Sequence, residues 1–333
     1  MSSRIKKIII LSLAAIATLC LVSIFDMSPF PEASLPALRS LSINTVAQAS
    51  ERFAQVALSA SSADLADHVA AIAYPRFEEV ERIQARGYLI EQLESFGWQV
   101  ELETFNEGIN LVAEKVGTDA EAGTLLVGAH FDTVKDSPGA DDNASAVAAL
   151  LEIARLFGSQ TNPRSLRLVF FDQEEQGLLG SLIHVANSAD PASIRGAIIL
   201  EMLGYTCDTP GCQRYPENLP FELPGDRGNF IGIIGDLDHP ELLEAFQSSD
   251  RPNLPPTITL PVPLSPNLPP DLLRSDHAAF WQRGLGAVLV TDTANFRNPH
   301  YHQPTDTADT LDLDFLTGVT QRVIDAVSML LKG

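Results

Sequence analysis

The chain has 333 residues, of which 45% are hydrophobic and 20% charged, a composition typical of a folded globular protein. Its formal net charge of −21 argues against nucleic-acid binding, which needs a basic surface. The same charge argues against adsorption of the globular part on anionic lipid. The length suits one large domain or two modest ones.

The N-terminus carries an export pattern. Arg4, Lys6 and Lys7 precede an apolar run over residues 8–25. A run of roughly 18 apolar residues is also long enough to span a bilayer, so residues 1–25 are either a signal peptide or a retained anchor. In both cases the segment inserts in or crosses a membrane. We therefore predict an exported protein, either membrane-anchored with an extracytoplasmic domain or secreted or periplasmic.

Residues 26–50 are rich in Ser, Pro and Ala, which predicts a linker, and residues 51–333 form the predicted main domain. Cys207 and Cys212 stand five positions apart in a Pro- and Gly-containing loop. In an exported protein this spacing favours a local disulfide. A two-cysteine metal site is the alternative, although no nearby residues complete it.

Helices are predicted first along the main domain. Apolar residues from Phe53 to Leu58 open one, and residues 77–96 form a strongly amphipathic one that ends at Gly97. Its apolar positions predict a single buried face: Val80, Ile83, Leu89, Ile90 and Leu93.

Strands and helices alternate beyond Gly97. The predicted strands are 98–105, 110–114, 124–129, 166–171, 197–200, 230–234, 257–260 and 287–291. The predicted helices are 144–157, 178–187, 240–247, 277–283 and 311–331. Apolar runs of this length fit buried strands of a parallel or mixed sheet. The pattern predicts an α/β layered domain with about eight strands.

Ionisable residues follow three of these strands at their carboxyl ends. His130 follows the strand 124–129, residues 172–175 follow the strand 166–171, and Glu201 follows the strand 197–200. Because sites in open α/β sheets form at this edge, we expect these side chains to meet there. The Pro-rich segments 206–227 and 251–273 either wall this site or are plain surface loops.

The side chains at these ends are imidazoles and carboxylates, which avoid a protein interior unless a metal or a partner compensates their desolvation. Zinc takes imidazole nitrogen and carboxylate oxygen, and two zinc ions close together need a bridging carboxylate. A hydrolytic site of this kind needs two imidazoles, about three carboxylate ligands and one spare carboxylate as a base. The chain supplies that inventory.

Four ordered motifs carry a resemblance to a known family: His130-x-Asp132, Gly139-Ala140-Asp141-Asp142-Asn143-Ala144-Ser145, Glu174-Glu175-x-Gly177-x-x-Gly180-Ser181, and Tyr301-His302-x-x-x-Asp306-Thr307. Together they resemble the co-catalytic di-zinc aminopeptidases secreted by bacteria, over residues 50–333. Glutamate carboxypeptidase and glutaminyl cyclase are relatives on the same fold. The resemblance implies a single three-layer domain with a central, mixed, mostly parallel eight-stranded sheet flanked by helices, the zinc-exopeptidase fold.

The resemblance also implies two zinc sites that share one ligand. His130, Asp142 and Glu201 hold one zinc. Asp142, Glu175 and His302 hold the other, so that Asp142 bridges the pair. In the best-known members Asp usually stands at the position of Glu201, and Glu is a competent ligand that is one methylene longer.

Three further roles follow from the resemblance. Glu174 is the general base that takes a proton from the bridging water. Asp132 accepts a hydrogen bond from the imidazole of His130 and so fixes its tautomer. Tyr301 offers a phenol to the tetrahedral oxyanion. The peptide bond after Asp142 is often cis in this family, and we expect the same here.

Several of these acidic residues, and one further pair, also have a plainer interpretation. Asp141 or Asp142 caps the helix predicted from residue 144. Glu174 and Glu175 are acidic residues favoured at a helix start. The pair Asp276-His277 either supports the site or merely begins a helix.

We predict from these residues an exported zinc exopeptidase, specifically an aminopeptidase that hydrolyses N-terminal peptide bonds through a metal-bridged hydroxide, with Glu174 as the base. Peptides and small proteins with free N-termini are the expected substrates. Two alternatives remain. One is a glutaminyl cyclase-like aminoacyltransferase with one zinc, and the other is a non-catalytic binding domain on the same fold.

Overall fold

The computed structural model describes residues 58–106, 108–188, 191–216, 225–248, 251–265 and 268–332. The predicted signal or anchor segment 1–25 and the predicted linker 26–50 lie outside these residues. All described residues belong to one compact unit, Ala54–Gly333. Within them, no helix combines the length and the hydrophobicity that crossing a bilayer requires.

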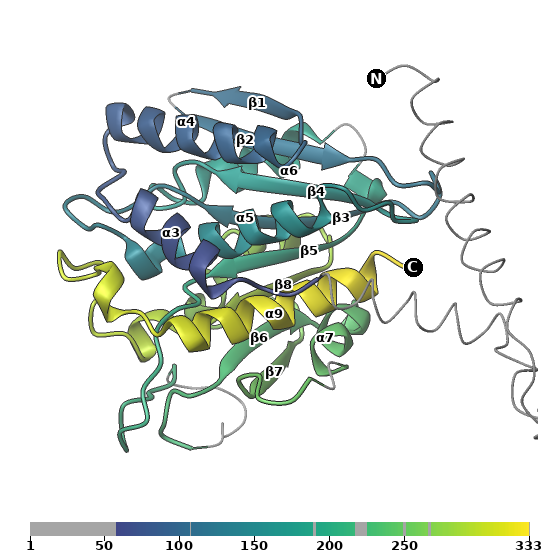
Figure 1. Ribbon diagram of the computed structural model, residues 1–333. Coiled ribbons are helices and arrows are strands. Elements are labelled where there is room, and N and C mark those ends of the chain that lie inside the picture. Colours follow the sequence, from purple (N-terminus) through teal and green to yellow (C-terminus); the bar gives the residue numbers. More distant parts are fainter. Residues whose placement is uncertain are drawn as a thin grey trace, which may run out of the picture. The chain divides into compact units, whose positions relative to one another are not determined.

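One mixed sheet organises the described residues, with its eight strands in the order β1-β2-β4-β3-β5-β8-β6-β7 (Figure 1). The strands are β1 (Val100–Phe105), β2 (Gly108–Lys115), β3 (Thr124–His130), β4 (Ser165–Phe171), β5 (Ile194–Glu201), β6 (Ile231–Asp236), β7 (Thr257–Val262) and β8 (Ala287–Thr291). The central strands β4, β3, β5 and β8 are parallel, while the pairs β1–β2, β2–β4 and β6–β8 are antiparallel. The predicted mixed, mostly parallel eight-stranded sheet is confirmed.

Helices cover both faces of this sheet and give three layers. The α-helices of the described residues are α3 (Ser62–Ile72), α4 (Glu79–Ser95), α5 (Ala146–Phe157), α6 (Leu179–Asn187), α7 (Pro240–Gln247), α8 (His277–Trp281) and α9 (Leu313–Leu330). The buried residues of α3, α4, α5, α7 and α9 share one hydrophobic cluster, and those of α6 and α8 share the other. In Figure 1 the yellow α9 crosses in front of the sheet beside α5 and α3.

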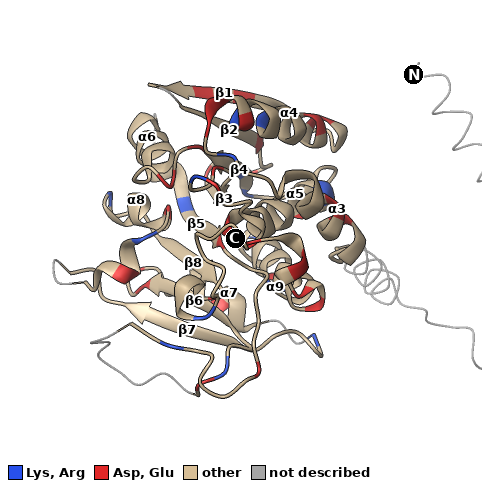
Figure 2. Cartoon of the chain, turned by 90° about the vertical axis from the view of Figure 1, so that its left-hand side faces the viewer, with Lys and Arg blue, Asp and Glu red and all other residues tan. Residues whose placement is uncertain are grey.

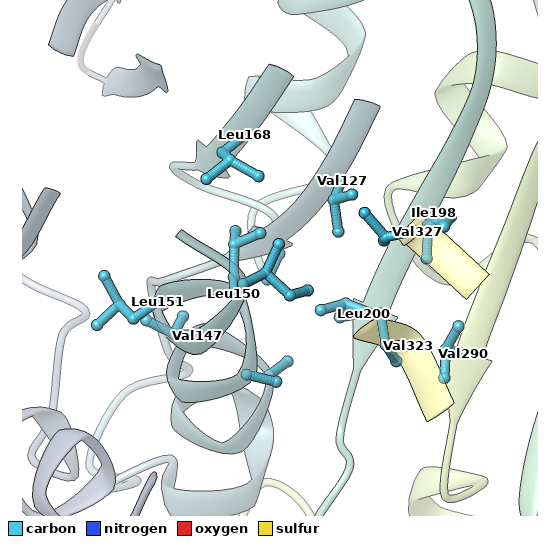
Figure 3. Packing of buried hydrophobic residues seen from close by; sticks show 14 of the residues in the cluster. Val127, Val147, Leu150, Leu151, Leu168, Ile198, Leu200, Val290, Val323 and Val327 are labelled. Carbon is cyan, nitrogen blue, oxygen red and sulfur yellow. The ribbon is translucent and has the colours of Figure 1, made fainter. Parts of the chain in front are cut away.

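The larger cluster packs between the sheet and the helices α5 and α9 (Figure 3). Its labelled members are Val127, Leu168, Ile198, Leu200 and Val290 from strands, with Val147, Leu150, Leu151, Val323 and Val327 from the two helices. All of them are fully buried. Burying one such side chain contributes roughly 2 kcal/mol, so this layer rigidly holds the strand ends that carry the site.

Helix α4 departs from its predicted buried face. Leu89 and Leu93 are buried and Ile90 is half-buried, as predicted. The prediction is wrong for Val80 and Ile83, which are 72% and 56% exposed. The N-terminal half of α4 therefore turns a different side to the sheet.

Two arginines explain this turn, because they occupy the inward side of α4. Arg82 Nε lies 3.0 Å from Asp172 Oδ1, and Arg86 Nη1 lies 3.0 Å from Asp172 Oδ2. All three side chains are buried. A buried carboxylate needs such partners, and satisfying Asp172 overrides the apolar periodicity of the helix.

Helix α3 is the described part of the first predicted helix. Residues 53–57 of that helix lie outside the described residues, and α3 begins at Ser62, where the Ser61 hydroxyl accepts the Asp64 N–H at 3.2 Å. Acidic residues (red) mark α3, α4 and α9, while basic residues (blue) are scattered over several elements (Figure 2).

Candidate metal centre

The predicted ligands gather at the carboxyl edge of the sheet. His130 ends β3 and Glu201 ends β5, while Glu174 and Glu175 follow β4. His130 stands opposite Phe171 in the parallel register of β3 and β4, so these strand ends are adjacent. The structure thus places these side chains at the same edge of the sheet, as their positions after the strands predict.

Two groups of three residues form there, His130–Asp142–Glu201 and Asp142–Glu175–His302, each with its candidate ligand atoms within 4.8 Å of one another. His130 Nε2 lies 3.3 Å from Asp142 Oδ1 and 3.4 Å from Glu201 Oε1. His302 Nε2 lies 3.2 Å from Asp142 Oδ2 and 3.2 Å from Glu175 Oε2. Asp142 therefore offers one oxygen to each group, as a bridging carboxylate does.

The donor set of these groups fits zinc. Imidazole nitrogens and carboxylate oxygens are ligands of this ion, and three protein donors leave a position open. Within the described residues, the buried atoms Asp142 Oδ1 and Glu175 Oε1 have no hydrogen-bond donor. Unpartnered buried oxygens are costly, and a cation compensates that cost. Although burial opposes its charged form, the imidazoles of His130 and His302 hold the pKa of Asp142 below its usual range.

The loop that carries Asp142 is held by side chains from distant segments. Asp306 accepts the N–H groups of Asp141 and Asp142 at 2.9 and 3.1 Å. Asn143 donates to the Leu200 carbonyl of β5 at 3.0 Å. The Asp142–Asn143 peptide bond is cis, as the resemblance implies. Asp306 stands in one of the four sequence motifs, but the motif alone indicates no role for it.

Asp141 belongs to neither group of candidate ligands, and its carboxylate makes hydrogen bonds instead. Its carboxylate accepts the Gly204 N–H at 2.8 Å and the Asn298 side-chain amide at 2.7 Å. The regular helix α5 begins only at Ala146, because the backbone at Asp142 and Asn143 is non-helical. Asp142 is therefore not a cap for a helix that begins at residue 144.

Arg76 is a second residue that sequence reasoning missed. Its buried guanidinium donates to the backbone carbonyls of Phe131, Pro138 and Gly139 at 2.6, 2.9 and 3.0 Å. These carbonyls lie on the segment that joins β3 to Asp142. Burial lowers the pKa of Arg76 to about 10. Since all these partners are backbone atoms, no sequence pattern marks the contact.

Asp132 orients both sides of the site. Its Oδ1 lies 3.3 Å from His130 Nδ1, the contact that the resemblance implies. The same carboxylate accepts the backbone N–H groups of Glu174 and Glu175 at 3.1 and 3.2 Å, contacts that no sequence motif indicates. One carboxylate thus aligns His130 and the turn after β4.

Glu174 belongs to neither group of three, although its side chain lines the same cavity. Burial raises the pKa of the Glu174 carboxyl well above its ordinary value; His130 opposes this, and the neighbouring Glu201 and Asp276 add to it. A buried carboxyl with a raised pKa is suited to accept and release a proton near neutral pH.

Glu201 is anchored by a residue that the sequence did not single out. The Ser275 hydroxyl donates to Glu201 Oε2 at 2.7 Å, and Glu201 Oε1 then faces His130 at 3.4 Å. The hydroxyl holds the longer side chain in place and leaves a single oxygen for a metal.

Asp276 and His277 have different surroundings, and His277 begins helix α8. Asp276 is buried near the site, and burial raises its pKa to about 7, with Glu201 contributing. His277 points away from it. Its Nε2 donates to the Leu272 carbonyl at 2.9 Å, and its ring packs edge-on against Trp281.

His277 makes a pH-dependent contribution to stability. Burial lowers the pKa of His277 to about 4 from an ordinary 6.5. Between these two pH values the imidazole is therefore neutral in the folded protein and protonated in the unfolded chain. This contribution is complete above pH 6.5 and is lost as the pH falls towards 4, up to about 3 kcal/mol. In urea unfolding, His277→Gln is expected to flatten the decline of the free energy of unfolding between these pH values. An unchanged pH slope contradicts this.

A cavity of about 380 Å³ opens onto the candidate metal ligands. Its apolar wall is formed by Phe230, Ile234, Ile258, Leu260, Leu272 and Leu289. Both Pro-rich segments contribute, the first through Arg214, Tyr215 and Pro216. Their described parts therefore wall the site. The first segment also contains the predicted disulfide, which joins Cys207 and Cys212.

Tyr301 lies in this cavity beside His302, with the two rings stacked and their centroids 3.7 Å apart. Burial raises the pKa of the Tyr301 phenol, with Asp142 adding to the effect and Arg274 opposing it. At neutral pH the phenol is therefore a protonated hydrogen-bond donor.

Comparison with known proteins adds to this geometry. The model of the family described as Peptidase family M28 matches residues 110–222, a range that contains the candidates from His130 to Glu201. YfbL of Escherichia coli (strain K12) is 35% identical over 231 residues, which are 65% of this chain and 69% of YfbL. Aminopeptidase YwaD of Bacillus subtilis (strain 168) is 39% identical over 82 residues, 24% of this chain and 18% of YwaD.

Solved structures share the fold. An aminopeptidase from Aneurinibacillus sp. strain AM-1 has a TM-score of 0.65 at 17% identity, covering 84% of this chain and 96% of its own. Glutaminyl cyclase of Bacteroides thetaiotaomicron has a TM-score of 0.59 at 18% identity, covering 81% and 98%. Taken with the family match and the extent of the likeness to YfbL, these findings confirm the resemblance. The chain belongs to peptidase family M28 and is, by class, a zinc metallopeptidase, a hydrolase.

Proposed function

We propose that the protein is an aminopeptidase that uses two zinc ions to hydrolyse the N-terminal peptide bond of peptides and small proteins. The observation that carries this proposal is the position of the Asp142 carboxylate between the two groups. One of its oxygens lies 3.3 Å from His130 Nε2, and the other lies 3.2 Å from His302 Nε2. His130, Asp142 and Glu201 would hold one ion, and Asp142, Glu175 and His302 the other.

Zinc bound at these residues would supply an acidified water and polarise the scissile carbonyl. Glu174, buried beside both groups, would accept the proton of the attacking water and return it to the leaving amine. The Tyr301 phenol donates to the oxygen that becomes negative in the transition state. Asp132 keeps His130 and the backbone of Glu174 aligned throughout.

Exopeptidase rather than endopeptidase activity is supported by the shape and charge of the cavity. Its volume of about 380 Å³ and its apolar wall suit one substrate side chain. The carboxylates that line it, those of Asp142, Glu174, Glu175 and Glu201, favour a free ammonium group over a neutral, continuing chain. Both features select the terminal residue of a substrate.

Export of the enzyme is a further part of the proposal. It is supported by the basic and apolar pattern of residues 1–25 and by a disulfide, Cys207–Cys212, typical of oxidising compartments. The peptides hydrolysed are then extracytoplasmic.

The glutaminyl cyclase alternative shares the fold but needs only one zinc. Two complete groups of ligands that share Asp142 favour hydrolysis. They also argue against a non-catalytic binding domain, since such domains have no need of a second ligand set or of Glu174.

The proposal is tested with leucyl p-nitroanilide and its N-acetylated form. The enzyme is expected to cleave the free-amine substrate and to lose that activity to a chelator, with recovery on adding zinc. Acetylation removes the ammonium charge and is expected to lower kcat/KM at least about 100-fold, the scale of a lost charged contact. Equal cleavage of both substrates contradicts an aminopeptidase, and formation of pyroglutamate from glutaminyl peptides supports the cyclase.

A further inference from the structure

We propose that Arg274 is a positioning residue that aims the hydroxyl hydrogen of Tyr301 at the substrate. This inference rests on the proposed function, in which Tyr301 stabilises the oxyanion, and it assigns a role to a residue outside the four motifs. Arg274 follows Leu273 and precedes Ser275, the residue that anchors Glu201.

Two contacts fix the phenol. Its ring stacks on the imidazole of His302 at 3.7 Å with an interplanar angle of 21°, which sets the plane of the ring. Arg274 Nη2 lies 2.8 Å from Tyr301 Oη, which sets the position of the oxygen. The guanidinium also lies over the same ring, 5.6 Å from its centroid.

The direction of the hydroxyl hydrogen follows from the chemistry of arginine. A guanidinium only donates hydrogen bonds, so Tyr301 Oη must be the acceptor of this contact. Its own hydrogen then points elsewhere, and among the described residues no acceptor takes it. Both side chains line the cavity that opens onto the metal ligands. The positive charge of the Arg274 guanidinium, 2.8 Å from the phenol oxygen, also polarises the O–H bond and makes the hydroxyl a stronger donor.

Arg274 is itself held by two partners. Its Nη1 donates to Asn295 Oδ1 at 2.9 Å and to Asp271 Oδ1 at 3.4 Å. Asp271 lies before Arg274 in the chain, whereas Asn295 follows β8, so the guanidinium links two walls of the cavity. The side chain is 40% exposed, which places these contacts at the cavity rim, where they organise the site more than they stabilise the fold.

A double-mutant cycle tests the role. Tyr301→Phe removes the donor and is expected to lower kcat about 100-fold. Arg274→Met keeps the phenol but removes the hydrogen bond that orients its hydroxyl group. We expect kcat to fall about 10-fold and KM to stay within about 2-fold of the wild-type value. Arg274→Lys keeps one donor and is expected to recover part of the loss. In the Tyr301→Phe background, Arg274→Met is expected to have no further effect.

Leucyl p-nitroanilide serves as the substrate because it has no carboxylate, and leucyl-leucine is its matched counterpart. Arg167→Met, which removes an arginine paired with Glu114 at the opposite end of β4, is the control and is expected to keep the wild-type kcat. The proposal is overturned if Arg274→Met acts equally with and without the Tyr301 hydroxyl. It is also overturned if the variant only raises KM for leucyl-leucine, the result for an arginine that binds the substrate carboxylate.

A crystal structure of the zinc-loaded Arg274→Met variant separates this inference from the proposed function. Tyr301 is expected to leave its wild-type position or to occupy more than one conformer. If the wild type cleaves neither substrate, the proposed function fails, while the position of Tyr301 still decides the role of Arg274. A phenol that stays in place without the guanidinium rejects the positioning role.

Discussion

Glu174→Gln is expected to leave a folded protein that binds zinc with wild-type stoichiometry but has a kcat about 1,000-fold lower. Glutamine has the size of glutamate and is polar but uncharged, like the protonated carboxyl group. The buried environment that raises the pKa of Glu174 is therefore expected to accommodate it. What the variant loses is the acceptor for the proton of the attacking water. Steady-state kinetics with leucyl p-nitroanilide, together with metal analysis, measure both halves of this expectation.

The matched control is Glu244→Gln, which makes the same change at an exposed position on α7. It is expected to retain wild-type kcat and KM. A Glu174→Gln variant whose kcat lies within about 3-fold of wild type would mean that another group accepts the proton, and the role of Glu174 would be withdrawn.

Substitutions of the ligands are expected to produce a diagnostic pattern of zinc loss. Glu201→Ala removes a donor from one group and Glu175→Ala from the other, so each variant is expected to keep one tightly bound zinc. Asp142→Ala removes the carboxylate that both groups share and is expected to weaken both ions. Mutating a residue that only hydrogen-bonds to a metal ligand typically lowers metal affinity about 10- to 100-fold. Removing a ligand itself is expected to cost more, so zinc affinity at each affected site should fall at least about 100-fold.

Chelator competition measures these affinities, and circular dichroism of the metal-free variants checks that each one folds. If Glu201→Ala and Glu175→Ala each lost both ions, or neither, the two groups would not be separate sites. If Asp142→Ala weakened only one ion, the bridging role of Asp142 would be wrong.

The sheet and the ligands at its strand ends were predictable because their signals are local. β3 and the second half of β5 are apolar runs, and His130 and Glu201 stand at their ends. A buried strand is recognisable from its own residues, and a strand end fixes which edge a side chain occupies. His302, far along the chain, came from the family resemblance rather than from periodicity.

The N-terminal half of α4 was not predictable in the same way. Val80 and Ile83 match an apolar face, but Arg82 and Arg86 are buried instead. Their partner, Asp172, is distant in sequence, and a periodicity argument treats arginine as a solvent-facing residue. The long-range ion pairs decide the orientation, and only the tertiary structure shows them.

The supporting residues of the site were missed for a related reason. Arg76 binds backbone carbonyls, Asp306 binds backbone N–H groups, and Ser275 binds a single oxygen of Glu201. Backbone partners leave no trace in residue types, and a serine-to-carboxylate contact has no characteristic spacing. Such positions follow from the geometry of the assembled strand ends.

Titrating zinc into the metal-free enzyme while following leucyl p-nitroanilide cleavage tests the central claim most directly. The two groups that share Asp142 predict that activity rises from the chelated baseline and reaches its plateau at two zinc ions per chain. A plateau at one ion with no gain from a second, or cleavage that persists without metal, would contradict a two-zinc aminopeptidase.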